Sequence, residues 1–338
     1  VVTGGYVEFI GDSGAATKVI CNGKTFLGDS DNWSQYLADK PNTGNKLNLT
    51  VKDLTLVSNL DRDCDRAIML CGTMGKGETA TFTNVNVSNW DCAKNGRSSY
   101  SNDKNTYAAS PAPVTIRGSQ VAVDATFTNC TFSNNTDDCA GALSVVGRNA
   151  KPHVTLNGCK FENNYQSMIA CDYLKVEDNH VHSGNIVVRN ADLLLKNCSI
   201  RSAPDAGATS WKGPCEYMLK DYKMHMTSGI AVAKDASCTI ESSTIEDLYV
   251  SPSRNDYGQK LDAQDPQRST VYALGSVTLA GNTKVTTAKA KGVDASDVGS
   301  YGKVHVDKSF TGEAALSVDD TKFDPESNKQ YYYYEYVN

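Results

Sequence analysis

Short apolar runs recur along the chain with one internal spacing. In each unit, an apolar residue is followed by apolar or small residues three and five positions later, as at Phe127, Cys130 and Phe132. Seven units follow this spacing, and they begin at Val51, Phe82, Phe127, Leu156, Val176, Leu195 and Ile240. The residue just before each second member tolerates the left-handed backbone of a tight turn. These turn residues are Asp53, Asn84, Asn129, Gly158, Asp178, Asn197 and Ser242.

The units predict two short strands around a turn, and a third apolar strand follows each of them. The third strands are expected at Ala67–Cys71, Val114–Arg117, Ala142–Val146, Met168–Cys171, Asn185–Val188, Ile230–Ala233 and Val271–Leu274. No run shows the three-four apolar spacing of a helix over ten or more residues. A repeat of short strands that cannot bury its own inward face is typical of a solenoid. We therefore predict an all-β fold, a parallel β-helix of about 8–10 coils.

Stacking of the coils places like residues above like residues. Cys130, Cys159 and Cys198 occupy the same position of three of the units and should form one internal column. Cysteine is often buried as a small apolar residue. The chain has 11 cysteines, an odd number, so at least one is unpaired. We expect the three column residues to be reduced structural thiols.

One elongated domain is predicted over residues 1–338, with long loop insertions at one corner and capped ends. Residues 1–48 are expected to hold the N-terminal cap and first coils, 49–300 the regular coils, and 301–338 the terminal coil and C-terminal cap. Every large insertion falls between a second and a third strand, so together they should form a wall. The short coils from about Asn157 to Asn197 would then form a shallow floor beside it.

The charge pattern limits the partners. The net charge is −6 and no basic run occurs, which argues against nucleic-acid binding. No stretch reaches about 18 apolar residues, so no membrane insertion is expected. The chain opens at Val1 without Met or a signal peptide, which we interpret as a trimmed or processed protein rather than as evidence for the cytoplasm. A monomer is favoured.

These units resemble the right-handed β-helix proteins of the pectin-lyase-like superfamily. The resemblance covers roughly Asn48 to Val318 and is carried by Asn-turn units such as FTNCTF and LKNCSI and by third strands such as GALSVVG and SGIAVA. The closing segment is similar to the last coils of large bacterial cell-surface proteins with β-helix passengers. The resemblance implies a right-handed helix and a secreted or cell-surface location. The fold hosts enzymes, adhesins and spacers alike.

Two acidic motifs are candidate sites. Asp137 and Asp138 stand in a DDC context that resembles the carboxylate pair of polygalacturonase-type glycosidases, where carboxylates act as acid and base. The Gly-His-Gly and Arg-Ile-Lys signatures of those enzymes are missing here. Asp61, Asp63 and Asp65 could bind Ca²⁺ through their oxygens, although no cofactor is required and Arg62 and Arg66 could neutralise the loop instead.

Aromatic residues in the insertions are candidate ligand-binding residues, because exposed rings beside a polar groove suit carbohydrate stacking. The alternative is that the rings pack the loops onto the helix. The residues are Tyr107, Trp211, Tyr217, Tyr222 and Tyr257.

Three functions follow from the sequence. The first is an extracellular module of a bacterial surface protein, which binds a polysaccharide, a host glycan or a host protein without catalysis. The second is a polysaccharide lyase or glycoside hydrolase that acts in a groove beside the insertions. The third is a structural spacer. Whether the chain is an enzyme stays open at this point, although the incomplete catalytic set favours the module.

Overall fold

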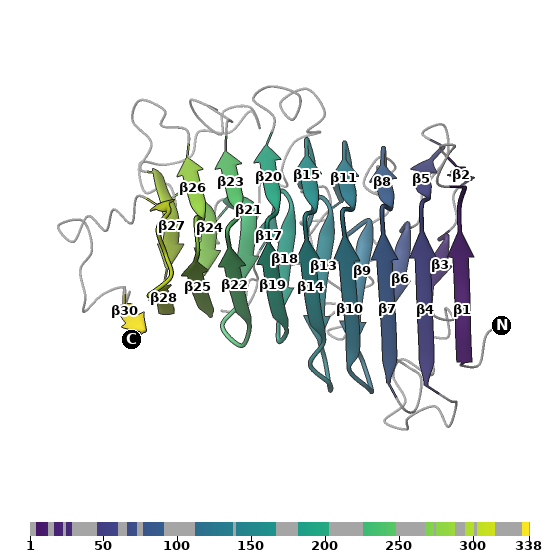
Figure 1. The fold of residues 1–338 in the computed structure, drawn as a ribbon, viewed down its shortest axis with the longest axis horizontal. Helices are drawn as coiled ribbons and strands as arrows, with labels where there is room; N and C mark the ends of the chain where they lie inside the picture. Colours follow the sequence, from purple (N-terminus) through teal and green to yellow (C-terminus); the bar gives the residue numbers. More distant parts are fainter. Residues whose placement is uncertain are drawn as a thin grey trace, which may run out of the picture.

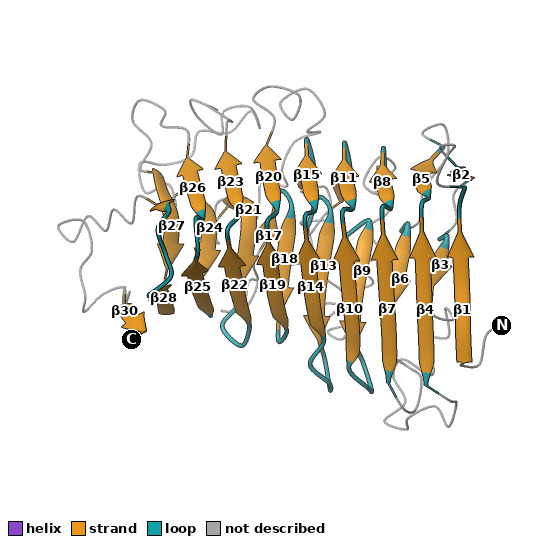
Figure 2. Ribbon diagram, in the orientation of Figure 1, coloured by secondary structure: helices purple, strands orange, loops and turns teal. Residues whose placement is uncertain are grey.

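The computed structural model describes residues 5–12, 17–22, 25–28, 46–59, 66–72, 77–90, 112–137, 140–166, 182–202, 226–247, 268–273, 275–287, 295–300, 303–314 and 333–337. Every regular element among these residues is a β-strand, and the strands form three all-parallel sheets. Figures 1 and 2 show coils stacked side by side along one long axis. The predicted all-β parallel β-helix is confirmed.

Sheet A has ten strands, and each strand pairs with its counterpart on the next coil. Figure 1 shows little change of strand direction between neighbouring coils from β1 to β14. The strands in spatial order are β1 (Gly5–Ile10), β4 (Leu47–Lys52), β7 (Glu78–Thr83), β10 (Val123–Thr128), β14 (His153–Asn157), β19 (Asp192–Lys196), β22 (Ser237–Glu241), β25 (Ser276–Ala280), β28 (Lys303–Asp307) and β30 (Tyr333–Val337).

Sheet B follows sheet A in each coil and has nine strands, so the described sheets agree with about 8–10 coils. Its strands are β2 (Lys18–Cys21), β5 (Thr55–Ser58), β8 (Asn86–Ser88), β11 (Thr131–Ser133), β15 (Lys160–Glu162), β20 (Ser199–Ser202), β23 (Thr244–Asp247), β26 (Lys284–Thr287) and β29 (Glu313–Ala314).

Sheet C closes each coil. Its strands are β3 (Leu27–Gly28), β6 (Ile68–Leu70), β9 (Val114–Gly118), β13 (Leu143–Gly147), β18 (Ile186–Arg189), β21 (Met226–Val232), β24 (Arg268–Ala273) and β27 (Ala295–Ser300), with β17 (His182–Ser183) beside β21. A separate pair joins β12 (Thr136–Asp137) to β16 (Tyr165–Gln166).

The core consists of columns of like residues. Phe82 and Phe127 are register partners on β7 and β10, and their rings stack 4.4 Å apart at an interplanar angle of 7°. Phe132 and Phe161 stack in the same way in sheet B, at 4.5 Å. All four side chains are at most 1 % exposed. Each stacked pair removes most of two aromatic surfaces from water. Burial of apolar surface of this kind stabilises the stacked coils.

The turn between sheets A and B has the predicted left-handed backbone. Positive φ angles near 50–64° occur at each described turn residue of the seven units. A non-glycine residue in this region costs about 1–2 kcal/mol, and Asn and Asp reduce that cost through local hydrogen bonds. The residues are Asp53, Asn84, Asn129, Gly158, Asn197 and Ser242, and Gly281 extends the series.

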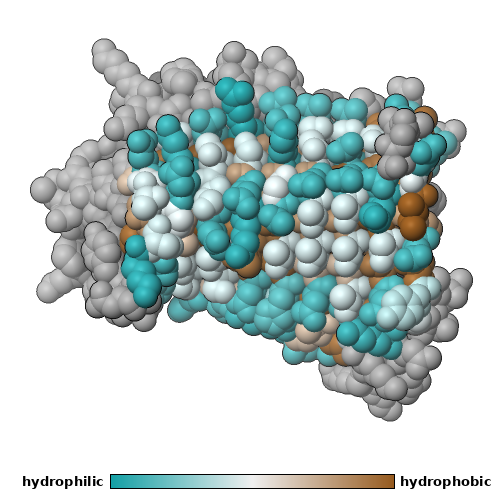
Figure 3. All heavy atoms as spheres, viewed as in Figure 1, coloured by the Kyte–Doolittle hydropathy of each residue, from teal (hydrophilic) through white to brown (hydrophobic). Residues whose placement is uncertain are grey.

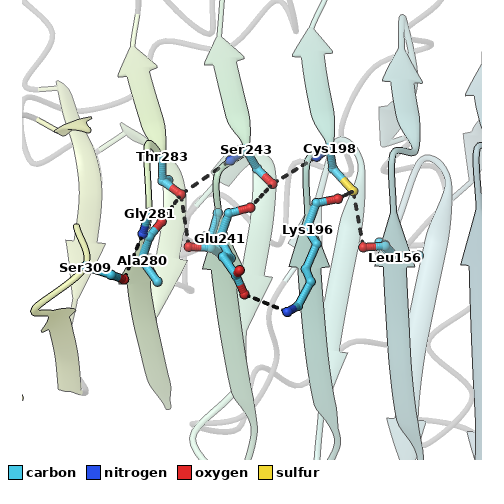
Figure 4. Close-up of polar contacts among 10 residues, drawn as sticks. Leu156, Lys196, Cys198, Glu241, Ser243, Ala280, Gly281, Thr283 and Ser309 are labelled. Carbon is cyan, nitrogen blue, oxygen red and sulfur yellow. Dashed lines mark hydrogen bonds and ion pairs between the residues drawn. The ribbon is translucent and has the colours of Figure 1, made fainter. Parts of the chain in front are cut away.

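The cysteine column lies on the inner side of this turn. Cys130, Cys159 and Cys198 are free and buried, and each thiol contacts a backbone carbonyl oxygen of the preceding coil at 3.4–3.6 Å. Hydroxyls continue the column: Thr283 Oγ1 donates to the carbonyl of Ile240 at 3.0 Å. Figure 4 shows Cys198, Ser243 and Thr283 on successive coils. The prediction of reduced, structural thiols is confirmed for these three cysteines.

One predicted coil does not exist. The unit at Val176, Asn179 and Val181 should have placed its own strands in sheets A and B, but β14 pairs directly with β19 and β15 pairs directly with β20. The third strand expected at Met168–Cys171 is excluded from the sheet C order by the direct pairing of β13 with β18. The three sheets therefore have no coil between those of β14 and β19, and the expected floor of short coils from Asn157 to Asn197 was wrong in counting one there; residues 167–181 themselves lie outside the described residues. A three-residue spacing pattern is too short to distinguish a coil from a loop.

The long connections fall mainly at one corner, as predicted. Segments 89–113, 203–225 and 248–267 each join a sheet B strand to a sheet C strand, and residues 163–185, which include β16 and β17, lie between β15 of sheet B and β18 of sheet C. A further connection, residues 29–46, joins β3 of sheet C to β4 of sheet A. The corner between sheets B and C therefore carries most of the added chain, but not all of it.

The two ends of the described solenoid are coils as well. Residues 5–28 already contribute one strand to each sheet, and β30 pairs with β28 as the last strand of sheet A. Residues 301–338 were expected to hold the terminal coil and C-terminal cap; β28, β29 and β30 lie in this range, and β30 is an edge strand of sheet A. In the part of the chain that the structure describes, no helix has the length and hydropathy needed to cross a membrane.

Candidate functional surface

The outer face of sheet A carries a row of threonines, which occupy six of the seven aligned positions from β4 to β25. Side chains alternate between the two faces of a strand, so every second residue points outward. Register pairing aligns the central outward residues of successive strands. From β4 to β25 they are Thr50, Thr81, Thr126, Thr155, Leu194, Thr239 and Thr278.

Additional threonines widen the row at its N-terminal half. Strand β7 presents three threonines outward, and Thr128 on β10 is the register partner of Thr83. We call the resulting set the threonine grid: Thr50, Thr79, Thr81, Thr83, Thr126, Thr128 and Thr155. Figure 3 shows regular rows of near-white side chains across this face. Neighbouring strands lie about 4.8 Å apart and alternate residues about 6.8 Å apart, so the grid is a two-dimensional lattice of hydroxyl and methyl groups.

The grid itself contains no charged side chain, but single charges border it, since Glu8, Lys52 and Asp124 are register partners of Thr50, Thr83 and Thr79. The seven grid side chains are uncharged and, like Asn157 beside them, partly or fully exposed to solvent. On the C-terminal side, Lys196 Nζ lies 2.9 Å from Glu241 Oε2 across neighbouring strands. Leu194 interrupts the row of threonines between Thr155 and Thr239. The face therefore has an uncharged grid bordered by single charges, and a C-terminal charged half where charged side chains pair.

Asp192 is the centre of the charged half. Lys151 Nζ lies 2.6 Å from Asp192 Oδ1, His153 Nδ1 lies 3.1 Å from Oδ2, and the Ser237 hydroxyl donates to Oδ1. Partial burial raises the pKa of Asp192, but the hydrogen bonds from Lys151 and Ser237 and the charge of Lys151 outweigh it and hold the pKa below its usual value. Asp192 is therefore a stable carboxylate at neutral pH.

The order of these groups limits their chemistry. The Asp192 carboxylate lies between the imidazole of His153 and the hydroxyl of Ser237, so the imidazole is not placed as a base for that hydroxyl. Asp124 is the register partner of His153 on its other side. Two carboxylates thus stand two strands apart, a backbone separation of about 9.6 Å.

The outer face of sheet C is enclosed instead of exposed. A cluster of small and apolar residues on this face is buried, and Arg117 is 0 % exposed. Burial, together with the nearby charges of Arg148 and Arg189, lowers the pKa of Arg117 to about 9. The buried cluster consists of Ala112, Ala140, Val187, Ala231, Ala233 and Tyr272. Sheets A and B, by contrast, present outward side chains to solvent, and sheet A has the longer strands.

The sequence-predicted site residues lie almost entirely outside the described residues. Asp137 is placed only as the backbone end of β12, and the other nine positions are not described. These nine are Asp61, Asp63, Asp65, Asp138, Tyr107, Trp211, Tyr217, Tyr222 and Tyr257. Within the described ranges, no group of three or more His, Cys, Asp or Glu side chains could hold a metal ion. The catalytic, Ca²⁺ and aromatic-site predictions therefore stay predictions.

The threonine grid was missed at the level of sequence. The alternation T-x-T-x-T at residues 79–83 was visible, and a strand with three outward threonines could have been read from it. The alignment of Thr50, Thr126 and Thr155 with that strand depends on register across coils separated by long connections. The Asp192 cluster depends on the same register.

Comparison with known proteins supports the fold. Residues 71–223 match the family model of the right handed beta helix region. No match was found among curated proteins or among solved structures. The three parallel sheets and this match together define a right-handed parallel β-helix protein. The predicted tie to pectin-lyase-like enzymes and bacterial surface proteins stays a prediction.

Proposed function

We propose that this protein is an extracellular carbohydrate-binding module that acts without catalysis, in the manner of an adhesin. The observation that carries the proposal is the outer face of sheet A, which is regular, polar and open to solvent. Hydroxyl groups at fixed intervals can both donate and accept hydrogen bonds, which matches the hydroxyl groups of sugars. A secreted or cell-surface location fits such a ligand.

Other ligand classes fit this face less well. A protein interface relies on buried Trp, Tyr and Arg anchors, while threonine is rare among such hot spots. The grid has none of those anchors among its seven side chains. Nucleic acid needs a basic surface, and the chain has a net charge of −6. An uncharged, hydroxyl-rich polymer suits the threonine grid of sheet A.

The test is a binding panel of soluble glycans, immobilised glycans and insoluble polysaccharides, measured with Ca²⁺ and with EDTA. Released reducing ends and unsaturated products are monitored for each ligand bound. Binding without product formation is expected. Turnover of a bound polymer would overturn the non-catalytic proposal. If no carbohydrate of the panel binds, the carbohydrate-binding function is wrong and a structural spacer is favoured.

A carbohydrate-active enzyme is the second candidate, and Asp192 is the observation that favours it. Lys151 touches its carboxylate, and Asp124 lies about 9.6 Å away by strand spacing. Inverting glycosidases separate their carboxylates by about 6.5–9.5 Å. This candidate predicts that product release is lost in Asp192→Asn and in Asp124→Asn, while Asp53→Asn, at a turn of the same helix, retains it.

A further inference from the structure

We propose that the threonine grid binds the flat face of an ordered, insoluble, uncharged polysaccharide, such as crystalline cellulose or chitin, in preference to soluble glycan chains. This inference rests on the proposed carbohydrate-binding function and specifies the physical state of the ligand.

The grid is pre-organised. Thr50, Thr81, Thr126 and Thr155 are held in one line by continuous register over four strands. Threonine is branched at Cβ, which restricts its χ1 angle, and each strand is hydrogen-bonded on both sides. Binding therefore orders little on the protein side. The surface keeps its spacing before the ligand arrives.

The shape of the face favours a flat partner. Open twisted sheets rotate by about 20–25° per strand, whereas side-chain ladders favour flatter stacks. Strands β4, β7, β10 and β14 keep nearly one direction in Figure 1, with unbroken register between them. A flat lattice of short side chains cannot surround a single flexible chain. It can lie against another flat lattice over many contacts at once.

The energetics distinguish solid from soluble carbohydrate. A dissolved glycan must lose conformational freedom on binding, which weakens its affinity. Chains within a crystal have already lost that freedom. Contacts that are individually weak then add up because their spacing is fixed, as in multivalent binding. Seven threonines supply hydroxyls for hydrogen bonds and methyls for apolar contact with the faces of sugar rings.

Charge complementarity sets the ligand's charge. The grid has no ionised group, whereas 21 % of the whole chain is Asp, Glu, Lys or Arg. A polyanion would find no net positive charge at the grid, because Lys52 beside Thr83 is offset by Asp124 beside Thr79, and Asp124 would repel it. An uncharged polymer has no such penalty. The neutral grid therefore fits cellulose or chitin better than pectin or another uronate polymer.

The experiment is depletion of the whole chain from solution by microcrystalline cellulose and by crystalline chitin, with soluble cello- and chito-oligosaccharides as competitors. In the test variant, Thr81→Lys is combined with Thr128→Lys. A matched control combines Ser133→Lys with Thr286→Lys on the outer face of sheet B, where both residues are half-buried as on the grid. The added charge is the same in both variants.

We expect the grid variant to lose binding at least tenfold and the control to bind as wild type. Thr81→Val with Thr128→Val keeps the shape and strand propensity and removes only hydroxyls, so it tests the grid even if the lysine variant fails to fold. It should bind several-fold more weakly. Circular dichroism and melting temperature report folding in each case.

Other outcomes overturn the inference in distinguishable ways. Solid-polymer binding that survives the grid variants would place the site elsewhere and leave the proposed function intact. Equal affinity for soluble oligosaccharides would contradict the preference for an ordered surface. If no carbohydrate binds at all, both the proposed carbohydrate-binding function and the preference for an ordered polymer are wrong. A dimer in light scattering that the grid lysines dissociate, or adsorption to ice that they abolish, would give the grid a different occupant.

Discussion

The side-chain amide of Asn135 donates to Oδ1 of Asn164 on the next coil at 3.0 Å, and both residues are at most 2 % exposed. Asn135 Nδ2 also donates to the carbonyl of Val87, and its Oδ1 accepts the backbone N–H of Trp90. Asn164 Nδ2 donates to the carbonyl of Phe132 and to Asn185 Oδ1. The two amides thereby link consecutive coils at the end of sheet B.

Removal of this link should destabilise the helix. Asn164→Ala leaves the buried carbonyl of Phe132 and the amide of Asn135 without their partner, and each unsatisfied buried group costs about 1–3 kcal/mol. We expect a loss of about 3 kcal/mol in the free energy of unfolding, measured by urea titration. Asn157→Ala, an exposed Asn at the end of β14, should change it by less than about 0.5 kcal/mol. Equal losses in the two variants would contradict the role of the buried amides.

The left-handed turn predicts an unusual ranking of substitutions at Asn129. Its φ is 53°, a conformation that costs a β-branched residue most and glycine least. Asn129→Val should lower stability by about 1–2 kcal/mol or more, whereas Asn129→Gly should stay within about 0.5 kcal/mol of wild type. Urea titration of both variants measures the difference. If the valine variant were the more stable of the two, the turn conformation would be wrong.

Buried thiols should resist alkylation in the folded protein. Hydrogen bonding to Cys130 and burial raise the pKa of Cys159 to about 12, a hydrogen bond to Cys159 and burial raise that of Cys198, and Cys130 is only 1 % exposed. Reaction then requires unfolded molecules, which make up roughly 10⁻³ or less of the population. Mass spectrometry after iodoacetamide treatment should show these three cysteines modified about 10³-fold more slowly in native than in urea-unfolded protein. Rapid native modification would show that the column is open.

Acid should remove the stability that Asp192 contributes. Its folded-state pKa lies below the ordinary value of 3.8, so the contribution is present above pH 3.8 and is lost as the pH falls through the folded-state pKa. Asp192→Asn removes the ionisable group. The stability difference between wild type and this variant should therefore shrink between pH 6 and pH 2, as measured by urea titration. A difference that stays constant over this range would contradict an ionised, paired Asp192.

Replacement of Arg117 by alanine should lower the free energy of unfolding more than its replacement by methionine. The side chain is fully buried on the outer face of sheet C. Arg117→Ala leaves a cavity and loses packing, with an expected cost of about 2–5 kcal/mol. Arg117→Met fills much of the volume without a buried charge, so it should retain at least half of that stability. A methionine variant as unstable as the alanine variant would show that the charge itself is required.

Much of this fold follows from the sequence alone. The spacing of Phe127, Cys130 and Phe132, with Asn129 before the cysteine, determined both strands, the turn between them and the inward column. These features depend only on alternation along a strand and on the few residue types that tolerate a left-handed turn. A short stretch of sequence is therefore enough to predict them. The burial of the cysteines followed for the same reason.

Tertiary structure decided which segments are neighbours. The unit at Val176 has the same local spacing as the true coils, yet β14 pairs directly with β19. Which strands pair depends on the competition among all strands of the chain, and the local spacing of one unit does not decide it. The same pairing aligns Thr81 with Thr126 and brings Asp192 beside His153. Neighbouring residues on the outer face of a β-helix come from successive coils. Because the connections between coils vary in length, the sequence spacing does not show which of these residues lie side by side.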